Sequence, residues 1–160
     1  MGALVGPQLS KALKTDTGGK VSVQGVSYSA GIAGDIDLGA SGSPAMASLA
    51  NKVLKECPNT KLVLSGYSQG ALLVHNALST GKIEGSKVAA VCVFGDPFNG
   101  QSFKGVDDSK VVRYCGSADP ICDHNGQKNA GGSHLGYSKE ASAAAAKVVS
   151  ITNSGSATSS

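Results

Sequence analysis

A serine on a turn bounded by glycines is the first feature of this sequence that suggests chemistry. Ser68 lies in the run Gly-Tyr-Ser-Gln-Gly, directly after an apolar strand-like stretch and directly before an apolar helix-like stretch. A strand–turn–helix unit of this kind exposes the serine hydroxyl at the carboxyl edge of a parallel sheet, and the first N–H groups of the helix point at the same place. Ser68 is therefore a candidate nucleophile, and a strand-to-helix turn without chemistry is the alternative.

A nucleophilic serine needs a histidine that takes its proton and a carboxylate that orients the histidine. In a sheet of this type the expected chain order is serine, acid, histidine. His134 precedes the last predicted helix and fits this order. His75 falls about two helical turns after the serine and is expected to be a packed or surface residue. His124 follows Asp119 by only five residues, which leaves little chain to turn back toward the serine.

Three aspartates near the ends of predicted strands compete for the role of the acid: Asp96, Asp119 and Asp123. Asp119 is preferred because Cys115 and Cys122 enclose it in a short loop, and a disulfide between them would hold the carboxylate in one place. A disulfide would also favour an oxidising compartment. Asp96 stays a rival because it directly follows a near-continuous apolar run, although an Asp-Pro turn also explains it.

Size and composition are those of one globular domain. The chain has 160 residues, of which 41% are hydrophobic and 16% charged, and it contains 22 glycines. The formal net charge is only +3, and no cluster of lysine and arginine predicts nucleic-acid binding. No apolar run approaches the roughly 18 residues that span a bilayer, and residues 1–13 have no signal-peptide pattern. No cluster of cysteine and histidine predicts a zinc site.

Strands alternate with helices along the chain, which predicts a parallel sheet covered by helices on both faces. Residues 87–94 are apolar almost throughout, and this is typical of a strand buried on both faces. Helices are predicted within residues 1–14, 43–56 and 138–149 and after Ser68, and strands at 21–26, 62–64, 87–94 and 110–114. Residues 27–43 and 116–133 are predicted loops, and a domain at 1–150 is followed by a disordered Ser/Thr-rich tail at 151–160.

Together these motifs resemble those of the cutinase family of serine esterases. The resemblance is carried by Glu-Cys-Pro at 56–58, Gly-Tyr-Ser-Gln-Gly-Ala at 66–71, Phe-Gly at 94–95, Cys-Gly-Ser-Ala-Asp-Pro-Ile-Cys at 115–122 and His-Leu-Gly-Tyr at 134–137. It implies a lidless α/β-hydrolase, a three-layer α/β/α sandwich with a mainly parallel sheet. It also implies a secreted monomer that hydrolyses cutin or other short- and medium-chain acyl esters, with no cofactor and no metal.

The resemblance also implies a role for each matching site residue. Ser68 would be the nucleophile, Asp119 the orienting acid and His134 the general base. The backbone N–H of Gln69 would be an oxyanion donor, and Cys115 and Cys122 would form a disulfide.

One departure from the family pattern concerns the amino terminus. The family begins with a strand and an oxyanion loop, whereas this chain opens near the family's Gly-x-x-x-Gly-Pro stretch, at residues 2–7. We therefore expect a truncated chain that lacks the signal, the first strand and the partner of Cys57. An inactive fragment is the alternative that follows, because loss of one oxyanion donor typically costs about 10² to 10³ in rate.

A second departure concerns the substrate. Residues 123–133, before the candidate histidine, are polar where the family has apolar residues that form one side of an acyl groove. Ile32, Ile36 and Leu38 could form the opposite side. An acetylxylan esterase-type polysaccharide deacetylase is therefore a second alternative, because a polar groove tolerates sugars.

Overall fold

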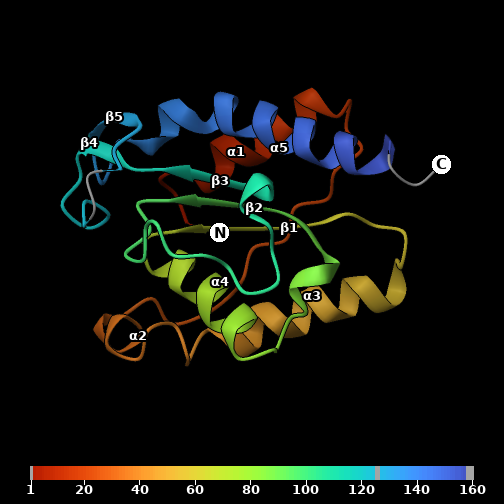
Figure 1. Ribbon diagram of the computed structural model, residues 1–160, viewed down its shortest axis with the longest axis horizontal. Coiled ribbons are helices and arrows are strands. Elements are labelled where there is room, and N and C mark those ends of the chain that lie inside the picture. Colours follow the sequence, from red (N-terminus) through yellow and green to blue (C-terminus); the bar gives the residue numbers. More distant parts are fainter. Residues whose placement is uncertain (1, 125–126, 158–160) are drawn as a thin grey trace.

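The computed structural model describes residues 2–124 and 127–157, and these form three layers (Figure 1). The middle layer is a sheet of strands β1 (Leu62–Tyr67), β2 (Val88–Phe94) and β3 (Val111–Tyr114), in that spatial order. Both strand pairs are parallel, so that the carboxyl ends of all three strands meet at one edge. The predicted α/β architecture with a mainly parallel sheet is confirmed.

Helices cover both faces of this sheet. Helices α1 (Gly6–Asp16) and α5 (Ala141–Ala157) lie on one face, and α3 (Ser43–Glu56) and α4 (Gln69–Ser79) lie on the other (Figure 1). The short helix α2 (Ile32–Ile36) contacts α4. Short 3-10 turns precede β2, β3 and α5, at Gly85–Lys87 (η1), Asp108–Lys110 (η2) and Tyr137–Glu140 (η3).

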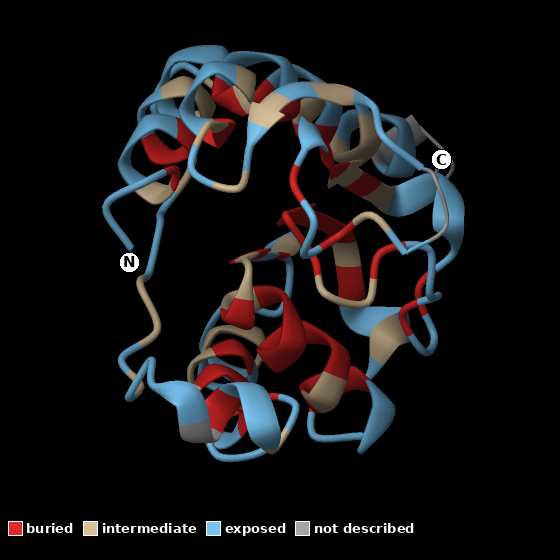
Figure 2. Ribbon diagram, turned by 90° about the vertical axis from the view of Figure 1, so that its left-hand side faces the viewer, coloured by how far each residue is buried: buried red, intermediate tan, exposed pale blue. Residues whose placement is uncertain are grey.

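Two groups of buried apolar residues join the layers, one on each face of the sheet (Figure 2). The central strand β2 contributes to both, because successive side chains of a strand point to opposite faces. Val91 and Val93 pack toward α3 and α4, whereas Cys92 and Phe94 pack toward α1 and α5. The prediction of a strand buried on both faces is thus confirmed.

Helix α5 is longer than the sequence predicts. A disordered tail is expected from residue 151, but the structure has helix as far as Ala157, and only residues 158–160 of that predicted tail lie outside the described residues. Ile151 packs against the core group under α5, and Lys61 Nζ donates to the carbonyl oxygen of Thr152. Tertiary contacts of this kind stabilise a helix whose own Ser/Thr-rich sequence has weak helix propensity.

Residues 21–26, predicted to be a strand, have no regular secondary structure. Val26 and Tyr28 instead pack partly buried against the core group on the α3 and α4 face. The alternation of apolar and polar residues here reflects packing of the segment against the core. Within the described part of the chain, the segment does not pair with a strand. The predicted loop at 27–43 contains helix α2.

A second sheet lies within the predicted loop at 116–133. Its two strands, β4 (Gly116–Ala118) and β5 (Ala130–Ser133), are parallel, with Ala118 opposite Ser133. Glycine, serine and alanine have low strand propensity, so nothing local predicts this pair.

Candidate active site

Ser68 lies on the sharp turn between β1 and α4. Its φ is +54°, a left-handed value that residues other than glycine rarely adopt. The turn needs glycine at position 66, because a Cβ there would clash with the backbone of Gly70. The N–H of Ser68 donates to the carbonyl oxygen of Phe94 at 2.9 Å, which fixes the turn to the end of β2. The predicted strand–turn–helix unit is confirmed.

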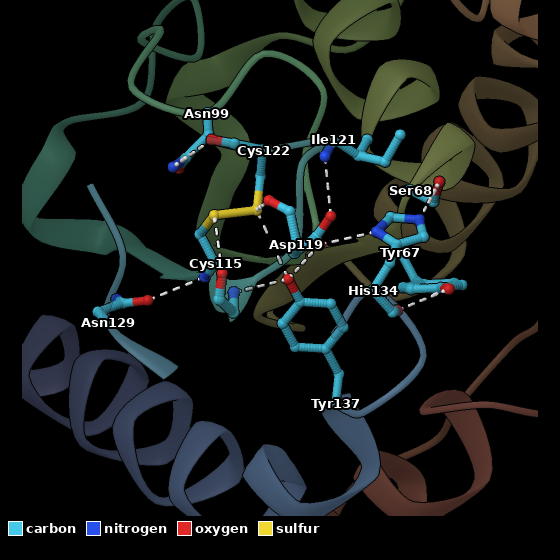
Figure 3. Close-up of polar contacts among 11 residues, drawn as sticks. Tyr67, Ser68, Asn99, Cys115, Asp119, Ile121, Cys122, Asn129, His134 and Tyr137 are labelled. Carbon is cyan, nitrogen blue, oxygen red and sulfur yellow. Dashed lines mark hydrogen bonds and ion pairs between the residues drawn. A yellow bond between two sulfur atoms is a disulfide. The ribbon is translucent and has the colours of Figure 1, made fainter. Parts of the chain in front are cut away.

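The small β4–β5 sheet brings Asp119 and His134 together. Asp119 follows the last residue of β4, and His134 follows the last residue of β5. Ala118 and Ser133 are opposite each other in a parallel register. The residues that follow them, Asp119 and His134, therefore also lie side by side. His134 Nδ1 is 2.7 Å from Asp119 Oδ2, and His134 Nε2 is 2.8 Å from Ser68 Oγ (Figure 3).

Asp119 is buried, and donors surround its carboxylate. Oδ1 accepts from the N–H of Ile121 at 2.9 Å, and Oδ2 accepts from the hydroxyl of Tyr137 at 2.5 Å as well as from His134. Burial acts to raise the pKa of Asp119, but these hydrogen bonds outweigh it and hold the pKa below its ordinary value. The group therefore stays a carboxylate at neutral pH, as the orientation of a histidine N–H requires.

Two further residues fix the position of His134. The hydroxyl of Tyr67 donates to the carbonyl oxygen of His134 at 2.9 Å, and the two rings lie 5.0 Å apart. Gly95 passes so close that a Cβ on it would lie 2.8 Å from His134 Nδ1 and 3.0 Å from Asp119 Oδ2. Sequence reasoning assigned no role to Tyr67 or Tyr137, although both stand inside motifs of the family resemblance.

Cys115 and Cys122 form the predicted disulfide, which closes the loop that carries Asp119. Asn99 is buried and donates from Nδ2 to the carbonyl oxygen of Cys122 at 3.2 Å, so a second segment also holds this loop. The other two cysteines are free thiols: Cys57 is exposed, and Cys92 is buried. Burial raises the pKa of Cys92 to about 12, which keeps it an unreactive thiol.

The rival acid, Asp96, has a different histidine as its partner. Its Oδ2 lies 2.8 Å from His75 Nε2 and 3.9 Å from Arg113 Nη1. The ring of His75 is stacked on Phe103 with 4.0 Å between centroids, so of the two predicted alternatives, a packed or a surface residue, the structure shows the packed one. Asp96 is thus occupied within a separate buried cluster.

The remaining candidates lie outside these contacts. His124 is exposed, and Asp123 forms an ion pair with Lys128 at 2.8 Å.

Gln69 is the first residue of α4 and therefore has an N–H without an intrahelical acceptor. This N–H adjoins Ser68, as an oxyanion donor must. The side chain of Gln69 donates from Nε2 to the carbonyl oxygen of Gly31 at 2.7 Å and to Asp35 Oδ1 at 3.0 Å. These bonds hold the α2 segment beside the candidate nucleophile. No group of three or more metal-ligating side chains occurs within residues 2–124 and 127–157.

Residues 1–152 match the protein family described as Cutinase. The chain belongs to this family. Cutinase 4 of Emericella nidulans is 47% identical over 150 residues, which make up 94% of this chain and 64% of that protein. A cutinase of Monilinia fructicola is 42% identical over 156 residues, 96% of this chain and 77% of that protein. The cutinase resemblance predicted from the motifs is confirmed. The chain spans less than two thirds of the Emericella nidulans relative.

Solved structures agree with this assignment. A Trichoderma reesei cutinase in complex with a C11Y4 phosphonate inhibitor superposes with a TM-score of 0.83 and 38% identity, over 95% of this chain and 69% of that one. An acetylxylan esterase has the same fold, with a TM-score of 0.71 and 24% identity over 92% of this chain and 89% of that one. No helix in the described part of the chain is long and apolar enough to cross a membrane.

Proposed function

We propose that this member of the cutinase family is a carboxylic ester hydrolase that cleaves cutin or other short- and medium-chain acyl esters. The observation that carries the proposal is the unbroken series of contacts from Asp119 through His134 to Ser68, at 2.7 and 2.8 Å. A serine is a weak nucleophile until a base accepts its proton, and this arrangement supplies an oriented base.

The reaction would proceed through an acyl-enzyme. Ser68 Oγ attacks the ester carbonyl carbon while its proton passes to His134 Nε2, and the Asp119 carboxylate stabilises the resulting imidazolium. The carbonyl oxygen becomes an oxyanion, to which the N–H of Gln69 donates. His134 then protonates the departing alcohol oxygen, and the acyl group stays on Ser68. A water molecule then attacks the acyl carbon while His134 takes one of its protons. The bond from the acyl carbon to Ser68 Oγ breaks, His134 returns the proton to Oγ, and the acid is released.

Exposed apolar side chains support an acyl rather than a sugar substrate. Ile32 and Ile36 on α2 are 79% and 77% exposed, and the side chain of Gln69 holds their segment beside the nucleophile. Ile121 and Leu135 lie in the loops that carry the acid and the histidine, and they are 41% and 65% exposed. Exposed apolar residues on the segments that carry or adjoin the candidate site are typical of a surface that binds an apolar ligand.

Part of the polar segment at 123–133 forms hydrogen bonds within the protein. Asn129 accepts from the N–H of Cys115 at 2.9 Å and donates to the carbonyl oxygen of Arg113 at 2.7 Å, which ties this part of the segment to β3. These bonds leave fewer polar groups of the segment for a sugar, and a polysaccharide deacetylase is therefore less well supported. Release of butyrate from p-nitrophenyl butyrate should exceed release of acetate from acetylated xylan, and the opposite preference would favour the deacetylase.

The activity of Ser68 can be tested without knowledge of the substrate. A fluorophosphonate probe reacts only with an activated serine, so the folded chain should be labelled, and Ser68→Ala and His134→Ala should not. Ser65→Ala is the matched control, because this exposed serine lies in β1, three residues before Ser68. Absence of label at Ser68 in folded wild-type protein would leave a non-catalytic member of the family as the better interpretation.

We also infer that the protein is secreted and acts as a monomer. The Cys115–Cys122 disulfide supports secretion, because disulfides persist in oxidising compartments. Recovery of the activity from the culture medium of the source cells, and elution as a single chain in size-exclusion chromatography, would test the two parts separately.

A further inference from the structure

Tyr137 is a buried tyrosine whose hydroxyl points at the carboxylate of the proposed triad (Figure 3). It lies at the start of η3, three residues after His134, and is 2% exposed. Its hydroxyl oxygen accepts from the N–H of Gly116 at 2.9 Å and lies 2.5 Å from Asp119 Oδ2. Because Gly116 already supplies a donor, the phenol proton is left for the carboxylate.

The oxygen that Tyr137 contacts is the one that His134 uses. Asp119 Oδ2 accepts from both side chains, at 2.5 Å from the phenol and 2.7 Å from the imidazole, whereas Oδ1 accepts from a backbone N–H. Two donors on one carboxylate oxygen share its negative charge. The stronger the bond from the phenol, the weaker the pull of Asp119 on a proton at His134.

We propose that Tyr137 is a positioning residue that fixes Asp119 and, by sharing Oδ2 with His134, sets the pH range over which the serine is activated. This inference rests on the proposed ester hydrolase function. The ring of Tyr137 lies edge-on to the His134 ring, with 6.3 Å between centroids, and Tyr137→Phe would keep that contact. The hydroxyl donates to Asp119 Oδ2, so its own effect on His134 passes through Asp119.

Few other ionisable groups face the pair. Tyr67, at the end of β1, contacts His134 through its ring and donates its hydroxyl to the His134 carbonyl oxygen. Burial, and after it the nearby Asp119, raises the pKa of Tyr67, and burial together with the bond to Asp119 raises that of Tyr137. Both phenols therefore remain neutral donors through the range in which an esterase works. Gly95, which directly follows β2, also faces the pair but has no side chain.

Removal of the phenol hydroxyl should raise the proton affinity of the His134–Asp119 pair. Whichever member of the pair holds the proton, the carboxylate of Tyr137→Phe has lost a competing donor, so the protonated state becomes more favourable. The acid limb of the pH profile for kcat/KM should move to higher pH by roughly half a unit to one unit. A tyrosine that only fills space would change kcat or stability and leave the limb in place.

Tyr114→Phe is the matched control. Tyr114 is also a buried tyrosine, at 4% exposed, but its hydroxyl has no hydrogen-bond partner in the described part of the chain. Its removal should therefore leave the acid limb unchanged. A limb that moves in Tyr137→Phe and stays in Tyr114→Phe supports the proposal, and a limb that stays in both overturns it.

Two further measurements keep this test independent of turnover and of folding. The titration of the His134 ring, followed by NMR in the folded wild type and in Tyr137→Phe, should show the same upward shift. If the wild type neither labels nor hydrolyses esters, the proposed function fails, while the NMR shift still decides the role of Tyr137. If Tyr137→Phe does not fold, site-specific 3-fluorotyrosine keeps the hydroxyl and strengthens it as a donor. The acid limb should then move to lower pH, and an unchanged limb refutes the inference.

Discussion

Gly95 offers the sharpest test of how the end of β2 positions the proposed triad. It directly follows the strand, has φ +56°, and donates its N–H to the carbonyl oxygen of Tyr114 at 2.9 Å. In Gly95→Ala, the new Cβ would lie 2.8 Å from His134 Nδ1, whereas ordinary contact begins near 3.4 Å. The imidazole would have to move by about 0.6 Å, the difference between these two distances, and displacements near 1 Å can cost about 10² in rate.

Alanine at this position also has a backbone penalty, which must be separated from the contact. A left-handed φ costs a residue with a Cβ roughly 1–2 kcal/mol. Gly81→Ala is the matched control, because Gly81 has φ +74° and a Cβ there would meet no atom within 4 Å. Both variants should lower the free energy of unfolding by similar amounts, and only Gly95→Ala should also lose activity.

The assay is hydrolysis of p-nitrophenyl butyrate beside thermal unfolding of each variant. Turnover of Gly95→Ala should fall by about 10², and that of Gly81→Ala should stay within about threefold of the wild type. If Gly95→Ala turned over as fast as Gly81→Ala, His134 would not need the space that glycine leaves, and the geometry argued for the site would be wrong.

Three further predictions concern the acid and its loop. Asp119→Asn should lower kcat by about 10³ to 10⁴, whereas Asp96→Asn should mainly destabilise, by about 1–3 kcal/mol; the reverse pattern of rates would move the acid role to Asp96. Burial raises and hydrogen bonds lower the pKa of Asp119, with a net lowering, so its contribution to stability should be lost as the pH falls below about 4. The denaturant midpoint of Asp119→Asn should therefore fall less than that of the wild type as the pH is lowered. An equal dependence of the midpoint on pH in both proteins would contradict this prediction. Reduction of the Cys115–Cys122 disulfide should lower the free energy of unfolding by about 2.5 kcal/mol, the loop entropy of a separation of seven residues, measured by urea unfolding with and without reductant.

The elbow at Ser68 could be predicted from sequence because all its signals are local. The apolar strand, the glycines at 66 and 70, and the apolar face of α4 lie within one short stretch of chain, and each corresponds to a physical requirement of the turn. The bounds of α3, Ser43–Glu56, were predictable for the same reason, since Pro44 at its start and its apolar face are both local.

The pairing of β4 with β5 could not be predicted in this way. The two strands are three and four residues long and consist of glycine, serine and alanine, so they have neither apolar periodicity nor strand propensity. Yet this pair places Asp119 beside His134. The prediction of those two residues came from chain order and from the two cysteines, and the contact that joins them is set by register between segments far apart in sequence.

The helical end of α5 could not be predicted either, because it also depends on contacts between distant parts of the chain. Composition predicts disorder from residue 151, but composition reflects only the intrinsic tendency of a segment and not its tertiary contacts. The packing of Ile151 and the bond from Lys61 to Thr152 join this part of the helix to elements distant in sequence, and they stabilise it beyond residue 150.

Two histidine–aspartate pairs lie at the carboxyl edge of the sheet, and their hydrogen bonds are almost equally short. His75–Asp96 is 2.8 Å and His134–Asp119 is 2.7 Å, so the pair distance alone does not tell a catalytic pair from a structural one. His75 is stacked on Phe103 and is 8% exposed as a residue, with its Nε2 directed at the carboxylate. His134 uses Nδ1 for its carboxylate, which leaves Nε2 for the hydroxyl of Ser68, and its side chain is 22% exposed. A histidine can act as a base on a nucleophile that its second nitrogen reaches, and His134 Nε2 reaches Ser68 Oγ, so His134–Asp119 is the pair that we propose as catalytic.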